Sequence, residues 1–397
     1  MVRLNTHYGE LKDSYLFYGI AQKTKAYLAA HPEQRLLRLG IGDVSRPLCP
    51  AVIRALHAAA DDQANAETFR GYMPEAGADF LREAVRGFYA GHGVRLTTDE
   101  IFISSGASDT LGDLLDLFSE DNTVLIPEPA YPAYVDANVI AGHRIVHLPS
   151  GEADGFAPVP AADTKADIVY ICSPGNPTGA VYTREKLQAW IDWANREGAV
   201  ILFDAAYEAF IQDPEIPHSI FELDGAAGCA IEICSLSKTA GFTGTRCGYT
   251  VIPAALERGG MSLNAMWLRN RTTKTNGVSY IIQRAAEAVF TEEGQRQIRE
   301  SIEFYRRNAA CLMQALDACG IRYCGGRNGP YIWLACPGGM DSWTFFDCLL
   351  EEAQIVGTPG AGFGACGDAW FRFTSFGSET DTREAAGRLV GLFGKNG

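Results

Sequence analysis

Positive charge and long apolar runs are both scarce in this sequence of 397 residues. It carries 34 lysines and arginines against 48 aspartates and glutamates, a formal net charge of −14. Nucleic acids and anionic membranes are bound by clustered lysine and arginine, so neither is an expected partner. No apolar run approaches the roughly 20 residues of a membrane-spanning helix, and the first residues lack the apolar core of a signal peptide. We therefore expect small molecules as ligands.

The eleven cysteines are not spaced like the ligands of a metal site. Their number is odd, they are scattered, and the pair Cys229 and Cys234 is too widely spaced for a zinc motif. Several, including Cys172, stand among apolar residues, where cysteine behaves as a small hydrophobic side chain. These features predict free thiols in a reduced, cytoplasmic protein without a metal site.

What the sequence does contain is an alternation of short β-rich runs with helical patterns between residues 95 and 255. Several runs are apolar at successive positions, as expected of strands buried on both faces of a parallel sheet. The seven runs are Ile101–Ser104, Thr123–Ile126, Arg144–His147, Ile168–Cys172, Val200–Asp204, Ala230–Cys234 and Gly248–Ile252. Helical patterns lie between them at Asp109–Phe118, Tyr131–Ile140 and Thr183–Glu197. The alternation predicts a large α/β domain with a mostly parallel, seven-stranded sheet.

The last third of the chain follows a different pattern. Helical patterns at Glu292–Cys319, Ser342–Ala353 and Glu379–Phe393 are interrupted by β-like runs at Tyr331–Leu334 and Phe371–Thr374. This mixture predicts a smaller α+β domain, and the length of the chain exceeds what one hydrophobic core usually serves. We expect residues 1–47 to form an N-terminal arm and part of the small domain, 48–285 the large domain, and 286–397 the C-terminal small domain.

A lysine at the end of one buried run carries the strongest chemical signal. Ser235-Leu236-Ser237-Lys238 follows the run Ala230–Cys234, and Arg246 stands eight residues beyond the lysine. Burying an unpaired ammonium is costly, whereas partial desolvation lowers the lysine pKa and frees an amine that forms Schiff bases. The two serines and the arginine suit a phosphate dianion. The alternative is a surface lysine in a glycine-rich loop.

Polar residues also follow the neighbouring runs. Asp204 ends one run and Tyr207 comes three residues later. Pyridoxal phosphate (PLP) needs a carboxylate at its ring nitrogen and a donor at its phenolic oxygen, which this pair could supply. Asn176 lies in the loop Ser173–Gly179, at the sheet edge where such folds bind ligands, and its amide could reach the same oxygen. The alternatives are a helix-capping aspartate and an ordinary turn.

Three further features fit the same cofactor. Gly106-Ala107-Ser108 joins a strand to a helix N-terminus, which is a ready site for phosphate. Tyr131 could stack on the pyridine ring, or pack in a turn. Arg372, between two phenylalanines, could bind the α-carboxylate of a substrate, or lie on an exposed strand face. Together the motifs predict PLP as the cofactor, with Lys238 as the residue that holds it.

The order and spacing of these motifs resemble the fold-type I, class I aminotransferases over nearly the whole chain. Within them the sequence resembles the LL-diaminopimelate aminotransferase family. The likeness is carried by stretches such as Arg38–Asp43, Gly71–Gly77, Tyr131–Asp136, Lys238–Gly244 and Thr358–Gly364. It implies the PLP-dependent transferase fold type I. It also implies transfer of an amino group from LL-2,6-diaminopimelate to 2-oxoglutarate, which gives tetrahydrodipicolinate and glutamate in lysine biosynthesis.

The resemblance also assigns roles to residues. It implies a homodimer with shared active sites, in which Tyr72 reaches the phosphate in the neighbouring subunit. Substrate would be contacted by Gly42, Tyr131, Asn176, Asn276 and Arg372, with Tyr15 and Glu75 at its distal end. The cofactor site would comprise Tyr72, Gly106, Ala107, Ser108, Tyr131, Asn176, Asp204, Tyr207, Ser235, Ser237, Lys238 and Arg246. Lys238 would be the catalytic base.

The chain departs from the family at Ser108. The family carries a substrate-contacting lysine directly after the Gly-Ala pair, and the segment between residues 141 and 149 is also shorter here. Loss of that cation should weaken binding of a distal carboxylate, whereas Glu75 would still favour a distal ammonium. We therefore hypothesise a drift toward lysine-like or other amino donors. A PLP-dependent carbon–sulfur lyase and a non-catalytic, cofactor-binding regulatory module are the alternatives.

Overall fold

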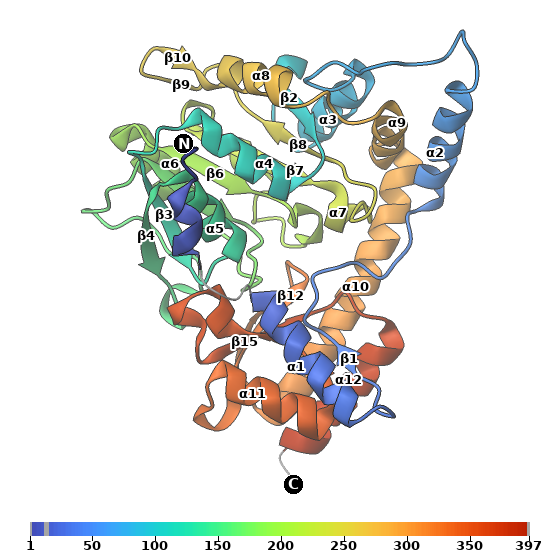
Figure 1. The fold of residues 1–397 in the computed structure, drawn as a ribbon, viewed down its shortest axis with the longest axis vertical. Helices are drawn as coiled ribbons and strands as arrows, with labels where there is room; N and C mark the ends of the chain where they lie inside the picture. Colours follow the sequence, from blue (N-terminus) through green and yellow to red (C-terminus); the bar gives the residue numbers. More distant parts are fainter. Residues whose placement is uncertain (1, 12–15, 395–397) are drawn as a thin grey trace.

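The computed structural model describes residues 2–11 and 16–394 and shows two parts, one above the other in Figure 1. The upper part is built on a seven-stranded sheet and the lower part on a four-stranded sheet. Helix α1 (Leu16–Ala30) lies with the lower part, where its Ile20 and Tyr27 pack against the core. None of the described helices is both long and apolar enough to cross a membrane.

The upper sheet confirms the predicted strands. In chain order they are β2 (Ile101–Ser104), β3 (Thr123–Glu128), β4 (Arg144–Pro149), β5 (Ile168–Cys172), β6 (Val200–Asp204), β7 (Ala230–Ser235) and β8 (Gly248–Val251). Their order across the sheet is β2-β8-β7-β6-β5-β3-β4. Strand β8 runs antiparallel to both of its neighbours, and the other pairs are parallel. The sheet is therefore mostly parallel, as the apolar runs predicted.

Both faces of this sheet are buried. Ile201 and Phe203 of β6 enter one apolar cluster, whereas Val200 and Leu202 enter another on the opposite face. This alternation follows from the period of two in a strand. The helices of the upper part are α2 (Pro50–Asp62), α3 (Asp79–Gly91), α4 (Ala107–Leu114), α5 (Pro132–Ala141), α6 (Arg184–Glu197), α7 (Leu236–Thr239), α8 (Leu263–Lys274) and α9 (Tyr280–Val289). A short hairpin, β9 (Glu257–Arg258) with β10 (Met261–Ser262), precedes α8.

All three helix starts predicted in this domain differ from the structure, and α6 begins one residue late, at Arg184, because Thr183 is its N-cap. Helix α4 begins at Ala107 rather than Asp109, because Gly106 turns the chain at φ 142°, a conformation open to glycine. Helix α4 ends at Leu114, and a 3-10 turn continues to Leu117. Helix α5 begins at Pro132, since proline suits the first helical position. The earlier start of α4 places its N-terminus directly at the end of β2.

The lower part has an antiparallel sheet of four strands, in the order β11-β12-β15-β14. The strands are β11 (Tyr323–Gly325), β12 (Tyr331–Ala335), β14 (Thr358–Pro359) and β15 (Trp370–Thr374). Besides α1, its helices are α10 (Glu292–Cys319), α11 (Ser342–Cys348) and α12 (Glu379–Phe393). The predicted helix Ser342–Ala353 is not a single α-helix, because its last turn, Leu349–Ala353, winds as a π-helix. An α+β arrangement results, as expected.

The N-terminal segment joins the lower part through a parallel pair of short strands, β1 (Leu37–Arg38) and β13 (Ile355–Val356). Helix α10 connects the two parts, because Ile302 packs in the upper core and Leu312 in the lower one. The domain boundaries at residues 47/48 and 285/286 stay predictions. All eleven cysteines are free thiols.

Candidate active site

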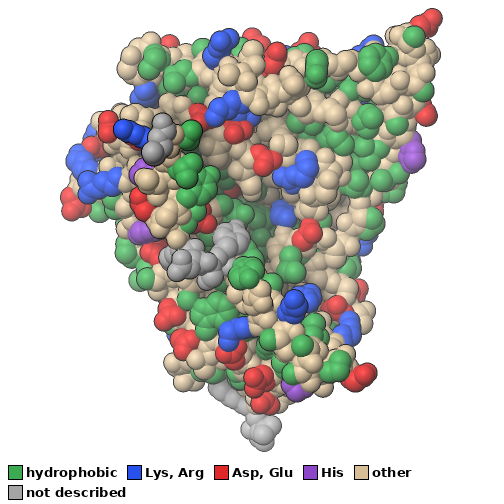
Figure 2. Space-filling view, viewed as in Figure 1, with side chains coloured by type: hydrophobic (Ala, Val, Ile, Leu, Met, Phe, Trp, Pro, Cys, Tyr) green, Lys and Arg blue, Asp and Glu red, His purple; other side chains and the backbone are tan. Residues whose placement is uncertain are grey.

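A cavity of about 380 Å³ lies where the ends of β6 and β7 face the small part of the molecule. In the space-filling view the surface is hollowed between the upper and lower parts (Figure 2). Residues that lie far apart in the sequence meet here, because parallel strands end at one edge of a sheet. Of the predicted site residues, the cavity is lined by Gly42, Ala107, Ser108, Tyr131, Asn176, Asp204, Tyr207, Ser235, Ser237, Lys238, Arg246 and Arg372.

One end of the cavity is suited to a phosphate group. The Arg246 guanidinium donates from Nη1 to Ser237 Oγ at 3.2 Å and to the Thr243 carbonyl at 3.2 Å. A Cβ atom on Gly106 would lie 2.3 Å from Arg246 Nη2, so a side chain there would displace the guanidinium from its place beside the N-terminus of α4. Arg246 itself has φ 64°, which is uncommon for a residue other than glycine. Cation, hydroxyls and free helix N–H groups converge as a dianion requires.

Lys238 lies in the short helix α7, whose N-cap Ser235 accepts a hydrogen bond from the Ser237 N–H. Burial lowers the pKa of Lys238 to about 8; Asp43 opposes this shift, and Arg246 and Arg372 add to it. Its Nζ lies 5.9 Å from the centre of the Phe376 ring. The lysine is therefore a partly desolvated amine in a cavity, which excludes the alternative of a surface lysine.

Asp204 ends β6 with its carboxylate buried; the residue is 5% exposed. It accepts hydrogen bonds from the Tyr134 hydroxyl and from the Ala206 N–H at 3.0 Å. Burial raises the pKa of Asp204, whereas these two bonds favour its charged form. The sequence did not point to Tyr134, although it lies three residues after Tyr131, the N-cap of α5, and the centres of the two rings are 5.6 Å apart.

Arg372 on β15 is 1% exposed, so the alternative of an exposed strand face is wrong. It donates from Nη1 to Asn176 Oδ1 at 2.7 Å and from Nη2 to the Gly40 carbonyl at 2.7 Å. Because the Asn176 oxygen is used by the arginine, its Nδ2 is the group left to donate into the cavity. The two predicted substrate-binding residues are therefore already joined.

Tyr207 lines the cavity with a partner that the sequence did not indicate. Its hydroxyl lies 2.9 Å from the hydroxyl of Tyr331, at the start of β12. Burial raises the pKa of both phenols. The only signal for Tyr331 in the sequence was its place at the start of a predicted strand.

Other predicted residues do not line this cavity. Tyr72 is 87% exposed, and Glu75 and Asn276 are also exposed. They belong to neighbouring segments of the surface, because Gly277 packs against the carbonyl of Pro74. Gly106 borders the cavity through its contact with Arg246. Tyr15 lies outside the described residues.

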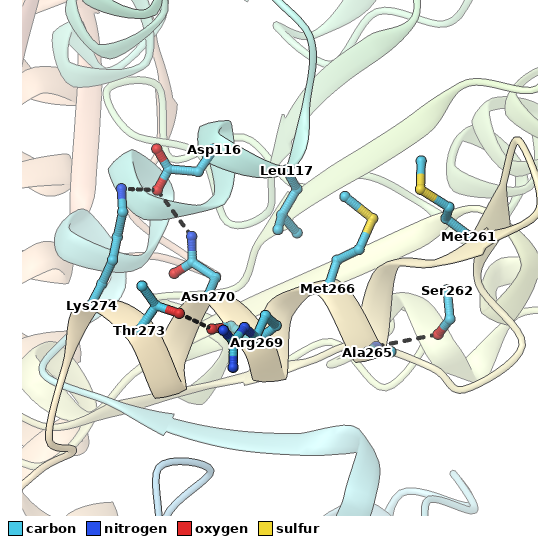
Figure 3. A pocket seen from close by; sticks show the side chains of 10 residues that line it. All are labelled: Asp116, Leu117, Met261, Ser262, Ala265, Met266, Arg269, Asn270, Thr273 and Lys274. Carbon is cyan, nitrogen blue, oxygen red and sulfur yellow. Dashed lines mark hydrogen bonds and ion pairs between the residues drawn. The ribbon is translucent and has the colours of Figure 1, made fainter.

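A larger hollow, of about 570 Å³, lies between α8 and the 3-10 turn Leu115–Leu117 (Figure 3). Leu117, Met261 and Met266 give it an apolar wall, and Lys274 forms an ion pair with Asp116 at one side. It contains none of the predicted site residues. Among the residues that the structure describes, no group of three or more histidines, cysteines or acidic side chains could hold a metal ion. The cavity at Lys238 is therefore the candidate active site.

Comparisons with known proteins agree with this geometry. Residues 34–389 match the family model for aminotransferase class I and II. The LL-diaminopimelate aminotransferase of Lachnospira eligens is 47% identical, covering 99% of this chain and 100% of that protein. The enzyme of the same name from Bacteroides fragilis is 46% identical, covering 98% of this chain and 99% of that protein.

Solved structures give the same result. L,L-diaminopimelate aminotransferase from Chlamydomonas reinhardtii superposes with a TM-score of 0.93 at 37% identity and covers 99% of both chains. A Thermus thermophilus aspartate aminotransferase mutant shares the fold alone, with a TM-score of 0.86 at 24% identity over 99% of this chain and 100% of that one. The predicted fold type I and the resemblance to LL-diaminopimelate aminotransferases are confirmed. The chain belongs to the class I and II aminotransferase family.

Proposed function

We propose that this aminotransferase uses PLP to transfer an amino group from LL-2,6-diaminopimelate to 2-oxoglutarate, as a cytoplasmic enzyme of lysine biosynthesis. One observation carries the proposal: Lys238, with a pKa lowered to about 8, shares a cavity with a buried carboxylate and a phosphate-binding end. The relatives with this name are 45–47% identical over nearly the whole chain. The free cysteines favour a reducing compartment.

The residues of the cavity fit PLP at each of its polar groups. Arg246, the serines 235 and 237 and the N-terminus of α4 would hold the phosphate. Asp204 would keep the ring nitrogen protonated, and Tyr207 with Asn176 Nδ2 would donate to the phenolic oxygen. Tyr131 would pack against the ring. When bound, PLP supplies an electron sink that stabilises negative charge at the substrate Cα.

Two residues would act on the amino acid itself. Arg372 would bind the α-carboxylate with its planar fork, and its bond to Asn176 would fix the direction of that fork. Lys238, as a free amine, would remove the proton from Cα, which is general base catalysis by a positioned group. Its pKa, lowered to about 8, leaves about a tenth of the amine unprotonated at pH 7, far more than in an ordinary lysine.

The amino donor depends on the distal end of the cavity. Among the residues described, the cations that line the cavity are Lys238, Arg246 and Arg372. Each already has a proposed role away from the distal end. Ser108 is exposed at the N-terminus of α4, where the resemblance places a lysine. This observation favours a second candidate function, transamination of lysine or another donor without a distal carboxylate.

A donor screen on the Ser108→Lys variant separates the two candidates. We expect the variant to raise kcat/KM for LL-diaminopimelate about 10- to 100-fold, because a charged hydrogen bond contributes about 1.5–3 kcal/mol. The kcat/KM for lysine should not rise, since lysine lacks the distal carboxylate. Initial rates with 2-oxoglutarate measure both, and Ser105→Lys, outside the cavity lining, is the matched control.

The wild-type enzyme decides between the donors. Preference for LL-diaminopimelate over lysine and other amino acids would support the first candidate and contradict the hypothesis of drift. Preference for lysine, combined with a gain for diaminopimelate in Ser108→Lys, would establish the second. An elimination product in place of amino transfer would contradict both candidates and favour the carbon–sulfur lyase.

We also propose that the enzyme is a homodimer whose subunits complete each other's sites. Tyr72, Glu75 and Asn276 are exposed and lie on neighbouring surface segments rather than in the cavity of their own chain. An exposed tyrosine beside other polar groups is available to a second copy. In a twofold dimer the same patch of each subunit would reach the other's cavity.

Mixed dimers test this sharing. Lys238→Ala and Tyr72→Ala chains, each weakly active alone, are expected to regain about one quarter of wild-type activity when co-expressed. About half of the dimers are then hybrids, and one of the two sites in each hybrid is intact. As a control, Lys238→Ala with Asp204→Asn should give no recovery, because both residues line the cavity of one chain. No recovery in the Tyr72 pair either would show that sites are not shared.

A further inference from the structure

Tyr331 is a buried side chain that touches both halves of the candidate site, the part that would hold the cofactor and the part that would bind the substrate carboxylate. It is 1% exposed and lies at the start of β12, in the small part of the molecule. Its hydroxyl is 2.9 Å from the hydroxyl of Tyr207, which would contact the cofactor. Its ring lies beneath the Arg372 guanidinium, with Cζ 4.5 Å from the ring centre, so it also supports the group that would contact the substrate carboxylate.

A third element depends on the same hydroxyl. A Cβ atom on Gly42 would lie 2.5 Å from Tyr331 Oη but 3.5 Å from Cζ, an ordinary contact distance. Gly42 is not among the glycines with positive φ, so its backbone would accept a side chain. The Tyr331 hydroxyl alone therefore requires glycine there. Packing against Tyr331 therefore explains why residue 42 is glycine, in addition to the substrate contact that the resemblance implies.

The hydroxyls of Tyr207 and Tyr331 each have one hydrogen to donate, and this fixes the direction of the hydrogen bond between them. If Tyr207 donates to the phenolic oxygen of the cofactor, the hydrogen between the two tyrosines must come from Tyr331. A hydroxyl that accepts one bond is polarised and donates the next more strongly. Arg372 above the ring favours this direction, because it lowers the pKa of Tyr331 against the effect of burial.

We propose that Tyr331 is a positioning residue with two separable effects: its hydroxyl directs Tyr207 toward the cofactor oxygen, and its ring holds the Arg372 guanidinium for the α-carboxylate. The proposal rests on the proposed function of the cavity. It predicts that the hydroxyl and the ring can be removed one after the other with different consequences.

Two substitutions separate the effects. In Tyr331→Phe the ring stays, so KM for the amino donor should remain within about twofold, while the pH midpoint of the bound cofactor's absorbance change rises by about 0.5 unit. The midpoint rises because a weaker donor stabilises the ionised phenolic oxygen less. In Tyr331→Leu the ring is lost too, and KM should also rise about tenfold, as expected when a buried cation–π contact is removed.

Tyr280→Phe is the matched control. It also removes a buried hydroxyl, which donates to Asp62 at 2.6 Å outside the cavity. The control should leave both the midpoint and KM unchanged. If Tyr331→Phe behaves like this control, the hydroxyl does not act through Tyr207 and the proposal is wrong.

Gly42→Ala tests the same hydroxyl without changing the residue at position 331. The added methyl group displaces the hydroxyl, so the absorbance midpoint should rise as in Tyr331→Phe, with a fall of at least about tenfold in kcat/KM from overpacking. In the double variant Gly42→Ala/Tyr331→Phe the clash is gone, and kcat/KM should return close to that of Tyr331→Phe alone. Additive losses in the double variant would overturn the proposal.

The outcomes that contradict the role of Tyr331 differ from those that contradict the proposed function of the cavity. The absorbance titration needs only bound cofactor, and the wild-type enzyme must show it before any variant is interpreted. If wild-type enzyme binds no PLP, the function assigned to the cavity is wrong. If it does, and Tyr331→Phe and Gly42→Ala leave the midpoint unchanged, only the role of Tyr331 is wrong.

Discussion

Lys238→Ala is expected to lower kcat by about 10⁴-fold, the upper range for loss of a general base. The amine is needed both to hold PLP and to remove the Cα proton, and the described lining residues offer no second lysine. Turnover of an amino acid with 2-oxoglutarate measures the rate. Borohydride treatment with mass analysis of the peptide that contains residue 238 measures covalent attachment.

The control for this variant is Lys165→Ala. Lys165 forms an ion pair with Glu197 on the surface, with its side chain 74% exposed. Its loss should change neither rate nor attachment, because exposed ion pairs contribute little. Covalent attachment at another lysine in Lys238→Ala, with turnover within tenfold of wild type, would contradict the assignment of Lys238.

The lowered pKa of Lys238 adds a dependence on pH to the same prediction. Only the unprotonated amine reacts with an aldehyde, so attachment of PLP to the apoenzyme should accelerate as the pH rises through about 8. An ordinary lysine, with a pKa of about 10.4, would give a midpoint more than two units higher. Stopped-flow absorbance at several pH values gives the midpoint. A midpoint near 10 would show that burial does not depress the pKa.

The sequence was most informative where a strand ends. Strands buried on both faces read as continuous apolar runs, so the residue at which polarity returns marks the edge of the sheet. Asp204 ends one such run and Lys238 follows another, so the sequence alone placed both residues at this edge, while their chemical roles stay predictions. The turn at Gly106 was also visible, although the start of α4 at Ala107 required the backbone angle of the glycine.

The partners of these residues could not be predicted in the same way. Tyr207 and Tyr331 are separated by 124 positions, and their hydroxyls meet only because the small part of the molecule packs over the end of β6. Tyr134 donates to Asp204 across 70 positions. A single sequence carries no signal for such pairs. Whether Arg372 is buried or exposed could not be predicted either, since the period of a strand does not show which of its faces is covered.

Asp204→Asn is the second substitution with a large expected effect, a fall of about 10³-fold in kcat. The asparagine keeps the shape of the side chain: its oxygen can still accept from the Ala206 N–H, and its amide nitrogen can donate to the Tyr134 hydroxyl, which now donates to Asp204. What it loses is the negative charge that would hold a proton on the ring nitrogen. Removal of one preorganised electrostatic group at a reacting centre typically costs about 10²–10³-fold. Steady-state kinetics with saturating PLP measure the loss.

Stability distinguishes loss of charge from loss of structure. Burial raises the pKa of Asp204, so the fold carries a cost for keeping this carboxylate charged at neutral pH. The neutral amide removes that cost, and the Tm of the Asp204→Asn apoenzyme should equal or exceed that of wild type. Tyr134→Phe, which removes one donor to the carboxylate, should lower kcat only about tenfold.

If Asp204→Asn keeps more than a tenth of wild-type kcat, charge at this position is not what the reaction requires. If instead its Tm falls steeply, the carboxylate serves the fold. A thousandfold loss of rate without loss of Tm is the combination that only an electrostatic role produces.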